Sequence, residues 1–266
     1  MKEANNRMRI ACVQQNHNPG GVNENRGKAL RAAREALEAG ADIVLFHEEL
    51  LIGYHSGVRA LAEPLDGETT RAFQALLAEM NSDSRIVYGL TERRGDQYHI
   101  SAPVVSREGV QAVYRKTHLW WKTPGLRCEP DTYTAGEGLV TFEHKGCKFG
   151  LVICYDGHFP EIFRAYAKLG CDAVLWMNNR CSRAPDDGPL WAVENNSLII
   201  ATTCCCGVDE IGQECPGLSH ILDADGSLLT PVLTGEGMVM ADIDPARPAA
   251  LRRENPSFVG ARFDLY

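Results

Sequence analysis

Short apolar runs alternate with longer amphipathic stretches in the first third of the chain. The short runs have the length and residue content of buried strands, whereas residues 23–39 place alanine and leucine on one side at helical spacing. Gly40 is placed to end that helix, because glycine readily takes the left-handed conformation found at helix ends. The pattern predicts strands over residues 8–16, 41–50 and 84–93, and helices over residues 23–39 and 67–81.

The pattern changes in the middle of the chain. Residues 98–119 contain two β-like runs joined across Arg107, Glu108 and Gly109, which is typical of a β-hairpin. Helices that alternate with strands and hairpins indicate an α/β fold with mixed sheets, and without a linker or repeat we expect one domain over residues 1–266. Later segments predict strands over residues 139–143, 149–153, 172–177, 197–206 and 237–243, helices over residues 159–169 and 189–196, and a hairpin with an Asp-Gly turn over residues 219–229.

Composition and charge exclude several classes of protein. The chain has 266 residues, of which 44% are apolar and 23% charged, as in ordinary globular proteins. Its net charge of −8 argues against binding to nucleic acid or to an anionic membrane surface. No apolar stretch approaches the roughly 20 residues that a membrane span needs. The chain start, MKEANNRMRI, lacks the apolar core of a signal peptide, so we expect a cytoplasmic protein.

Ten cysteines raise the question of disulfides or a bound metal. Cys12, Cys154 and the run from Cys204 to Cys206 lie in or beside apolar β-like runs, where a free cysteine packs as a small hydrophobe. A reducing cytoplasm would keep most of these thiols free. No two cysteines have C-x-x-C spacing, so we expect no zinc site.

Cys154 ends an apolar run and is followed at once by a predicted helix. A cysteine at such a turn would lie beside the first unpaired N–H groups of the helix, which favour a thiolate and the oxyanion that a thiolate creates. The alternative is that Cys154 is simply a packed strand residue. Its position in the sequence does not decide between the two.

Glu48 and Lys116 also stand at or just beyond the ends of β-like runs. Burial would raise the pKa of Glu48 and suit it to act as a general base near neutral pH. The Lys116 ammonium could stabilise an oxyanion and lower the pKa of a nearby thiol from its free value of about 8.5. Each could instead be an exposed surface residue, and spacing alone does not show that Glu48, Lys116 and Cys154 meet.

Three segments give a more specific indication. HEELLIGY, YRKTHLW and GLVICYDGHFPEIFR contain these three residues, and together they resemble the nitrilase superfamily of carbon–nitrogen hydrolases, whose members use a Glu-Lys-Cys triad. CEPDTYTAG resembles the family segment with a second glutamate, which falls on Glu129, seven residues before Gly136. The resemblance covers nearly the whole chain. It implies a four-layer αββα sandwich of two mixed sheets flanked by helices.

One position departs from the family pattern. A proline usually precedes the catalytic glutamate, whereas His47 precedes Glu48 here and Glu49 follows it directly. We assign Glu48, because Gly53 and Tyr54 then stand at the family's usual distance. Neighbouring strand residues point to opposite faces, so only one of the two glutamates can face the thiol. Glu49 is expected to be a solvent-facing residue at the strand end.

The resemblance implies that a small amide is cleaved to a carboxylic acid and ammonia through a thioester on Cys154, without a metal or an organic cofactor. Glu48 would act as the base, Lys116 and the backbone N–H of Tyr155 would stabilise the oxyanion, and Glu129 would hold Lys116. An amide is favoured over a nitrile, because the chain is shorter than the long nitrilases and has Cys-Tyr-Asp at the nucleophilic position. A nitrilase and an N-carbamoyl amine or amino acid amidohydrolase are alternatives within the family.

The remaining expectations concern the pocket and the assembly. The family resemblance also implies subunits that pair across helical faces into a homodimer or a larger homo-oligomer. Two other classes stay open: a catalytically silent binding protein with this fold, and a redox protein that uses the run from Cys204 to Cys206. The substrate pocket is expected to be lined by Tyr54, Tyr155, Trp121, Asn178 and Asn179.

Overall fold

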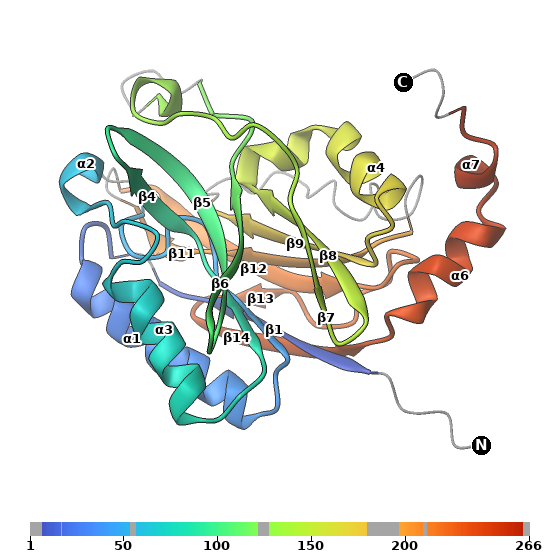
Figure 1. Cartoon of the computed structure of the whole chain (residues 1–266), viewed down its shortest axis with the longest axis horizontal. Helices are drawn as coiled ribbons and strands as arrows, with labels where there is room; N and C mark the ends of the chain where they lie inside the picture. Colours follow the sequence, from blue (N-terminus) through green and yellow to red (C-terminus); the bar gives the residue numbers. More distant parts are fainter. Residues whose placement is uncertain are drawn as a thin grey trace.

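The chain folds into two β-sheets that pack face to face, with helices on their outer faces (Figure 1). The structure, a computed structural model, describes residues 7–16, 18–53, 57–121, 128–179, 197–209 and 212–262. The predicted four-layer αββα sandwich is confirmed.

The first sheet combines the first half of the chain with one late strand. It contains β1 (Met8–Gln14), β2 (Ile43–Leu45), β3 (Arg85–Val87), β4 (Leu90–Arg94), β5 (Gln97–Ser106), β6 (Gly109–Arg115) and β14 (Gly237–Ile243). The strand order is β14-β1-β2-β3-β5-β4, and β6 pairs with β5. β1, β2 and β3 are parallel, whereas the other pairs are antiparallel. The predicted hairpin corresponds to β5 and β6.

The second sheet comes from the second half of the chain. It contains β7 (Thr141–His144), β8 (Cys147–Ile153), β9 (Ala173–Asn178), β10 (Ile199–Cys204), β11 (Cys206–Val208), β12 (Glu214–Leu222) and β13 (Leu233–Thr234). The strand order is β11-β12-β10-β9-β8-β7, and β13 pairs with β12. β8, β9 and β10 are parallel. Each sheet therefore has three parallel strands among its members, which makes both sheets mixed.

Three of the predicted helices form within one or two residues of their expected ends. They are α1 (Val22–Glu38), α3 (Glu68–Glu79) and α4 (Pro160–Lys168). The helix predicted over residues 189–196 lies outside the described residues. The pattern did not predict α2 (Val58–Leu61), α6 (Ala246–Glu254), α7 (Pro256–Val259) or the two 3-10 turns η1 (Glu129–Asp131) and η2 (Cys154–His158).

The main core lies between the two sheets. Leu45 of the first sheet and Leu151 and Leu175 of the second belong to one cluster of fully buried side chains. A second cluster lies under α4, where Phe163 packs edge-on against Trp176 at a ring-centroid distance of 5.8 Å. The central strands β8, β9 and β10 of the second sheet are thus covered on both faces, which explains why they are mainly apolar runs in the sequence.

Two predicted strands are interrupted in the structure. The run over residues 84–93 breaks between β3 and β4 at Gly89, which lies against the chain that follows β2. A Cβ on Gly89 would lie 2.4 Å from the amide nitrogen of Glu49, so only glycine fits there without displacement. The run over residues 197–206 breaks at Cys205, between β10 and β11.

Within the described ranges, no helix has both the length and the apolar character of a membrane span. The same residues contain no group of three or more His, Cys, Asp or Glu side chains arranged to hold a metal ion. Eight of the described cysteines are free and Cys215 is disulfide-bonded, in agreement with the expectation that most thiols are free.

Candidate active site

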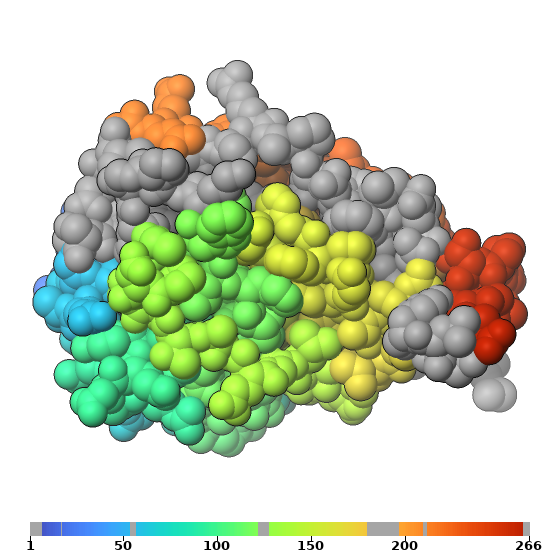
Figure 2. Space-filling model, turned by 90° about the horizontal axis from the view of Figure 1, so that it is seen from above, coloured from blue at the N-terminus to red at the C-terminus, as the bar shows by residue number. Residues whose placement is uncertain are grey.

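Glu48, Lys116 and Cys154 all lie just beyond strand ends. Glu48 is three residues past β2, Lys116 directly follows β6, and Cys154 directly follows β8. β2 and β8 belong to different sheets of the sandwich, and Lys116 contacts Glu48 and lies in the field of Cys154, so residues that follow the three strands come together. Figure 2 shows the green segments around β6 against the yellow segments around η2 and α4 on the face seen from above.

A buried ion-pair cluster occupies this edge. Lys116 Nζ donates to Glu48 Oε1 at 2.8 Å and to Glu129 Oε1 at 2.9 Å, and all three side chains are 0% exposed. The second oxygen of Glu129 accepts from the backbone N–H of Trp120 at 2.7 Å. Glu48 Oε2, by contrast, has no hydrogen-bond partner. A buried oxygen is rarely left unpaired, so Oε2 is the atom of this cluster that is available to take a proton.

Burial and neighbouring charges set the protonation of the cluster. Loss of solvent raises the pKa of Glu48 to about 7; the Lys116 ammonium opposes this rise, whereas Glu129 and Glu49 add to it. Burial alone would lower the pKa of Lys116, but the carboxylates of Glu48 and Glu129 outweigh it and raise the pKa well above its usual range. Lys116 therefore stays charged while Glu48 exchanges a proton near neutral pH.

Two glycines allow the backbone to bring these residues together. A Cβ on Gly89 would lie 2.5 Å from the Cα of Glu48, so the absence of a side chain lets β3 press against the Glu48 turn. The N–H of Gly136 donates to the carbonyl of Lys116 at 2.8 Å, and a Cβ there would lie 2.2 Å from the carbonyl oxygen of Arg115. Close backbone approach thus explains the glycine found seven residues after Glu129.

Cys154 lies at a sterically unfavourable turn. Its φ of 45° is in the left-handed region, which residues other than glycine rarely adopt. Trp176 Nε1 donates to the Cys154 carbonyl at 3.2 Å and helps to hold the turn. Cys154 is 6% exposed, and it lies close enough to Lys116 to contribute to the raised pKa of that ammonium. The structure therefore brings Cys154 into the electrostatic field of Lys116.

The predicted direct passage from strand to α-helix at Cys154 is wrong. Cys154 begins η2, a 3-10 turn of five residues, and α4 begins only at Pro160. Backbone N–H groups of an α-helix therefore do not lie beside the sulfur. The positive charge facing Cys154 is that of Lys116.

Asp156 is an important residue of this turn to which the sequence analysis gave no role. It is 0% exposed, and it ties the segment after β6 to the turn that carries Cys154. Burial and the charge of Asp156 raise the pKa of Tyr114, so the phenol stays a donor. In the sequence, the Cys-Tyr-Asp motif was the feature that could have indicated a role for Asp156. Four donors reach the Asp156 carboxylate: Tyr114 OH at 2.8 Å, Ile153 N at 3.1 Å, Thr117 Oγ1 at 3.0 Å and His118 N at 2.8 Å. The His118 ring nitrogen Nδ1 also lies 3.0 Å from Asp156 Oδ1.

The two adjacent glutamates have different surroundings. Glu48 contacts Lys116, as assigned from the sequence, whereas Glu49 accepts hydrogen bonds from Thr91 Oγ1 at 3.2 Å and from Tyr133 OH. Glu49 is 0% exposed, so the expectation of a solvent-facing residue is wrong. The reason is that the chain turns after β2 and packs this side chain against β4 and the segment after η1.

Asn178 and Asn179 follow one another at the end of β9, beside the end of β10. Both are buried, and each keeps one amide atom without a hydrogen-bond partner, Oδ1 of Asn178 and Nδ2 of Asn179. Cys205 Sγ donates to Asn179 Oδ1 at 2.7 Å. Burial, Cys204 and the charge of Glu48 raise the pKa of Cys205, which places Cys205 and its partner Asn179 close to Glu48.

The aromatic residues predicted to line the pocket have different positions. The Tyr155 ring is half-buried and meets the Trp120 ring edge-on, at a centroid distance of 4.9 Å. Trp121 is 62% exposed, so it is a surface residue and not part of the core. Tyr54 lies outside the described residues.

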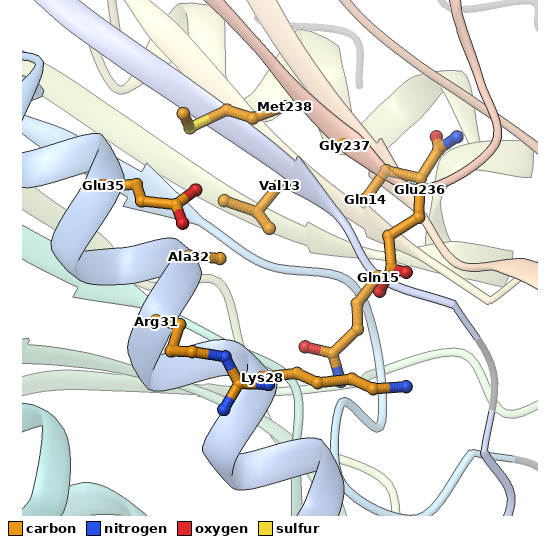
Figure 3. A pocket seen from close by; sticks show the side chains of 10 residues that line it. All are labelled: Val13, Gln14, Gln15, Lys28, Arg31, Ala32, Glu35, Glu236, Gly237 and Met238. Atoms are coloured by element: carbon orange, nitrogen blue, oxygen red, sulfur yellow. The ribbon is translucent and has the colours of Figure 1, made fainter.

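A cavity of about 330 Å³ opens elsewhere, between α1, the end of β1 and the start of β14 (Figure 3). Its charged lining comes from Lys28, Arg31 and Glu35 of α1 and from Glu236. Glu48, Lys116 and Cys154 do not line this cavity. The Gln14 amide at its wall is already hydrogen-bonded within the protein through both its nitrogen and its oxygen. This cavity is therefore separate from the candidate active site.

Comparison with known proteins identifies the family. The family model described as Carbon-nitrogen hydrolase matches residues 9–253. An (R)-stereoselective amidase from Pseudomonas sp. is 30% identical over 256 residues, which cover 93% of this chain and 89% of that protein. A nitrilase from Pyrococcus abyssi is 30% identical over 216 residues, which cover 78% of this chain and 76% of that protein.

A solved structure agrees with this assignment. A double mutant of the amidase from Nesterenkonia sp. AN1 in complex with acrylamide superposes with a TM-score of 0.81 at 25% identity, covering 96% of this chain and 99% of that one. The family match runs through both sheets and through all three strand ends that carry the candidate site. The chain belongs to the carbon–nitrogen hydrolase family.

Proposed function

We propose that the protein hydrolyses a small amide to a carboxylic acid and ammonia, with Cys154 as the nucleophile. One observation carries the proposal: Lys116 bridges Glu48 and Glu129, while Glu48 keeps a buried oxygen without a partner. A carboxyl whose pKa is raised to about 7 is suited both to take and to return a proton at neutral pH. The amidases among the relatives support the choice of reaction.

In the first half-reaction, Glu48 takes the thiol proton and the Cys154 sulfur attacks the amide carbon. A C–S bond forms, and the carbonyl electron pair moves onto oxygen. The Lys116 ammonium and the backbone N–H of Tyr155 stabilise this oxyanion. Glu48 then gives its proton to the amide nitrogen, the C–N bond breaks, and ammonia leaves a thioester on Cys154.

In the second half-reaction, water attacks the thioester carbon. Glu48 takes a proton from the water, and the same two donors stabilise the second oxyanion. The C–S bond breaks, the proton passes from Glu48 to sulfur, and the carboxylic acid is released. Glu129 acts through Lys116, since its carboxylate helps to keep the ammonium charged and in place. One water is consumed and one ammonia released.

Asn178 and Asn179 are proposed to recognise the substrate amide. The unpaired Oδ1 of Asn178 is an acceptor for an amide N–H, and the unpaired Nδ2 of Asn179 is a donor for a carbonyl oxygen. A nitrile offers no N–H group to Asn178, so this pair favours an amide. Tyr155 and Trp121 would form the outer wall of the pocket.

A nitrile is the second candidate substrate, because a nitrilase is among the relatives of equal identity. The discriminating experiment measures ammonia released from butyramide, acrylamide, butyronitrile and an N-carbamoyl amine. We expect kcat/KM for butyramide to exceed that for butyronitrile by about tenfold or more, because only the amide satisfies both asparagines. A ratio in favour of the nitrile would assign a nitrilase instead.

The catalytically silent binding protein is tested by thiol reactivity. Iodoacetamide labelling followed by mass spectrometry should modify Cys154 well before the other free cysteines, because Cys154 lies in the field of the Lys116 ammonium. Cys154→Ala is the control for the labelled peptide. Labelling of Cys154 no faster than the others, together with no ammonia from any amide, would refute the proposed function.

A further inference from the structure

Glu49 is a second buried carboxylate directly beside the proposed base, and the mechanism above does not use it. Its φ of 48° is in the left-handed region, which is unfavourable for a glutamate. Backbone contacts hold the turn in this conformation: Gly53 N donates to the Glu49 carbonyl at 2.8 Å, and Leu50 N donates to the Gly89 carbonyl at 2.9 Å. A glutamate kept at such a position needs an explanation.

The carboxylate of Glu49 connects two other segments of the fold. Both Thr91 of β4 and Tyr133, which follows η1, donate hydrogen bonds to Glu49 Oε1. Tyr133 is itself 4% exposed. Two hydroxyl donors on one oxygen are the environment of an ionised carboxylate, which only accepts hydrogen bonds.

Tyr133 leads back to the catalytic cluster. Its backbone N–H donates to the Glu129 carbonyl at 2.7 Å and closes the η1 turn. Glu129 in turn accepts from Lys116, and Lys116 donates to Glu48, the residue next to Glu49 in the chain. The contacts therefore form a closed ring.

We propose that Glu49 is a positioning residue: by binding Tyr133 it closes the ring of contacts that fixes Glu48 and Glu129 around the Lys116 ammonium. The inference rests on the proposed function, since it assumes that Glu48 is the base. Because the ring is closed through Glu49, the distance between the Glu48 carboxylate and the Lys116 ammonium does not depend on loops outside the ring.

Glu49 also acts through its charge. The groups that face Glu48 are Lys116 after β6, Glu129 of η1, Glu49 itself, and Cys205 after β10. Lys116 lowers the pKa of Glu48, whereas burial and the two other carboxylates raise it. Removal of the Glu49 charge should therefore lower the pKa of Glu48, an effect that a purely structural residue would not have.

The test compares pH profiles of ammonia release from butyramide for the wild type, Glu49→Gln and Glu49→Asp. In Glu49→Gln, the acid limb of kcat/KM should move to lower pH by about one unit, and kcat should fall by about tenfold. Glu49→Asp keeps the charge but withdraws the carboxylate from Tyr133. It should lower kcat without moving the acid limb to lower pH, and Tyr133→Phe should behave in the same way.

Glu79→Gln is the matched control, because it removes the same charge from an exposed pair with Arg34 on the outer helices. Its profile should match the wild type. An acid limb that stays in place in Glu49→Gln, with kcat within about twofold of the wild type, would overturn the proposal. An equal shift of the acid limb in Glu79→Gln would also overturn the proposal.

The alkylation rate of Cys154 separates this proposal from the proposed function. If the wild type releases no ammonia from any amide, the function fails, but the pH dependence of iodoacetamide labelling still reports the proton affinity of Glu48. A labelling profile that moves to lower pH in Glu49→Gln supports the role of Glu49. An unchanged labelling profile refutes it.

Discussion

Asp156 and Glu48 are two buried carboxylates near Cys154, and the fold gives them different hydrogen-bond partners. Asp156 accepts four hydrogen bonds through both of its oxygens and also contacts His118 Nδ1, whereas Glu48 pairs with Lys116 through one oxygen and, among the described residues, leaves the other without a partner. Both residues are 0% exposed. Burial alone therefore does not distinguish a supporting acid from a reactive one. The two acids differ in the number of donors that reach each carboxylate.

The difference follows from the free energy of a buried polar group. Each satisfied hydrogen bond to a charged group stabilises the fold, and each unsatisfied atom costs about 1 to 3 kcal/mol. Asp156 thus fixes the relative position of the Lys116 and Cys154 segments. Burial raises the pKa of Glu48, and the Lys116 ammonium only partly offsets that rise.

Loss of the reactive groups should have the largest effect on activity and little effect on folding. Cys154→Ala should lower ammonia release by about 10⁴-fold or more, and Glu48→Gln by about 10³-fold, because one lacks the proposed nucleophile and the other the proposed base. The free energy of unfolding of Glu48→Gln should stay within about 1 kcal/mol of the wild type at pH 7, where the acid is already partly protonated. Steady-state kinetics and urea unfolding provide the measurements.

Lys116→Met should combine a loss of activity with a new pH dependence of stability. Activity should fall by about 10³-fold, since the oxyanion loses its cation. Glu48 and Glu129 then lie together without a counter-charge, so their folded-state pKa values rise above the unfolded values. The variant should therefore be most stable at acid pH and lose stability as the pH rises to 8. A thermal midpoint that instead rises with pH would contradict this account of the cluster.

Asp156→Ala should affect folding more than any change at Glu48. Four donors would lose their acceptor in a buried turn, so the free energy of unfolding should fall by about 3 to 5 kcal/mol. Asp156→Asn keeps one acceptor oxygen and should lose less. Tyr114→Phe removes one donor only and should lose about 1 to 2 kcal/mol. If Asp156→Ala unfolds at the same urea concentration as Glu48→Gln, the contrast between the two acids fails.

The smallest expected effect is the change of kcat/KM with pH in the wild type. Glu48 must be ionised to accept the thiol proton, so kcat/KM should fall by about tenfold per unit as the pH drops below about 7. Lys116 should cause no loss on the alkaline side in the accessible range, because its pKa is raised well above the usual value. A profile that is flat from about pH 5 to 8 would mean that Glu48 is not the titrating base.

The sequence by itself determined the alternation of strands and helices, the mixed α/β class and the three strand ends that carry Glu48, Lys116 and Cys154. These features follow from local periodicity, and the family motifs supplied the order of the site residues. The choice of Glu48 as the neighbour of Lys116 agrees with the structure. The helices α1, α3 and α4 form where their patterns predict, because each buries one apolar stripe against the sandwich.

Only the tertiary structure decided how these parts act on one another. The burial of Glu49, the 3-10 turn at Cys154 and the break at Gly89 all depend on segments that are distant in the sequence and touch only after folding. The same holds for the four donors of Asp156 and the unpaired oxygen of Glu48. Local pattern reports which side of an element is apolar, but hydrogen-bond satisfaction and pKa are set by whichever groups the packing of two sheets brings within a few ångströms.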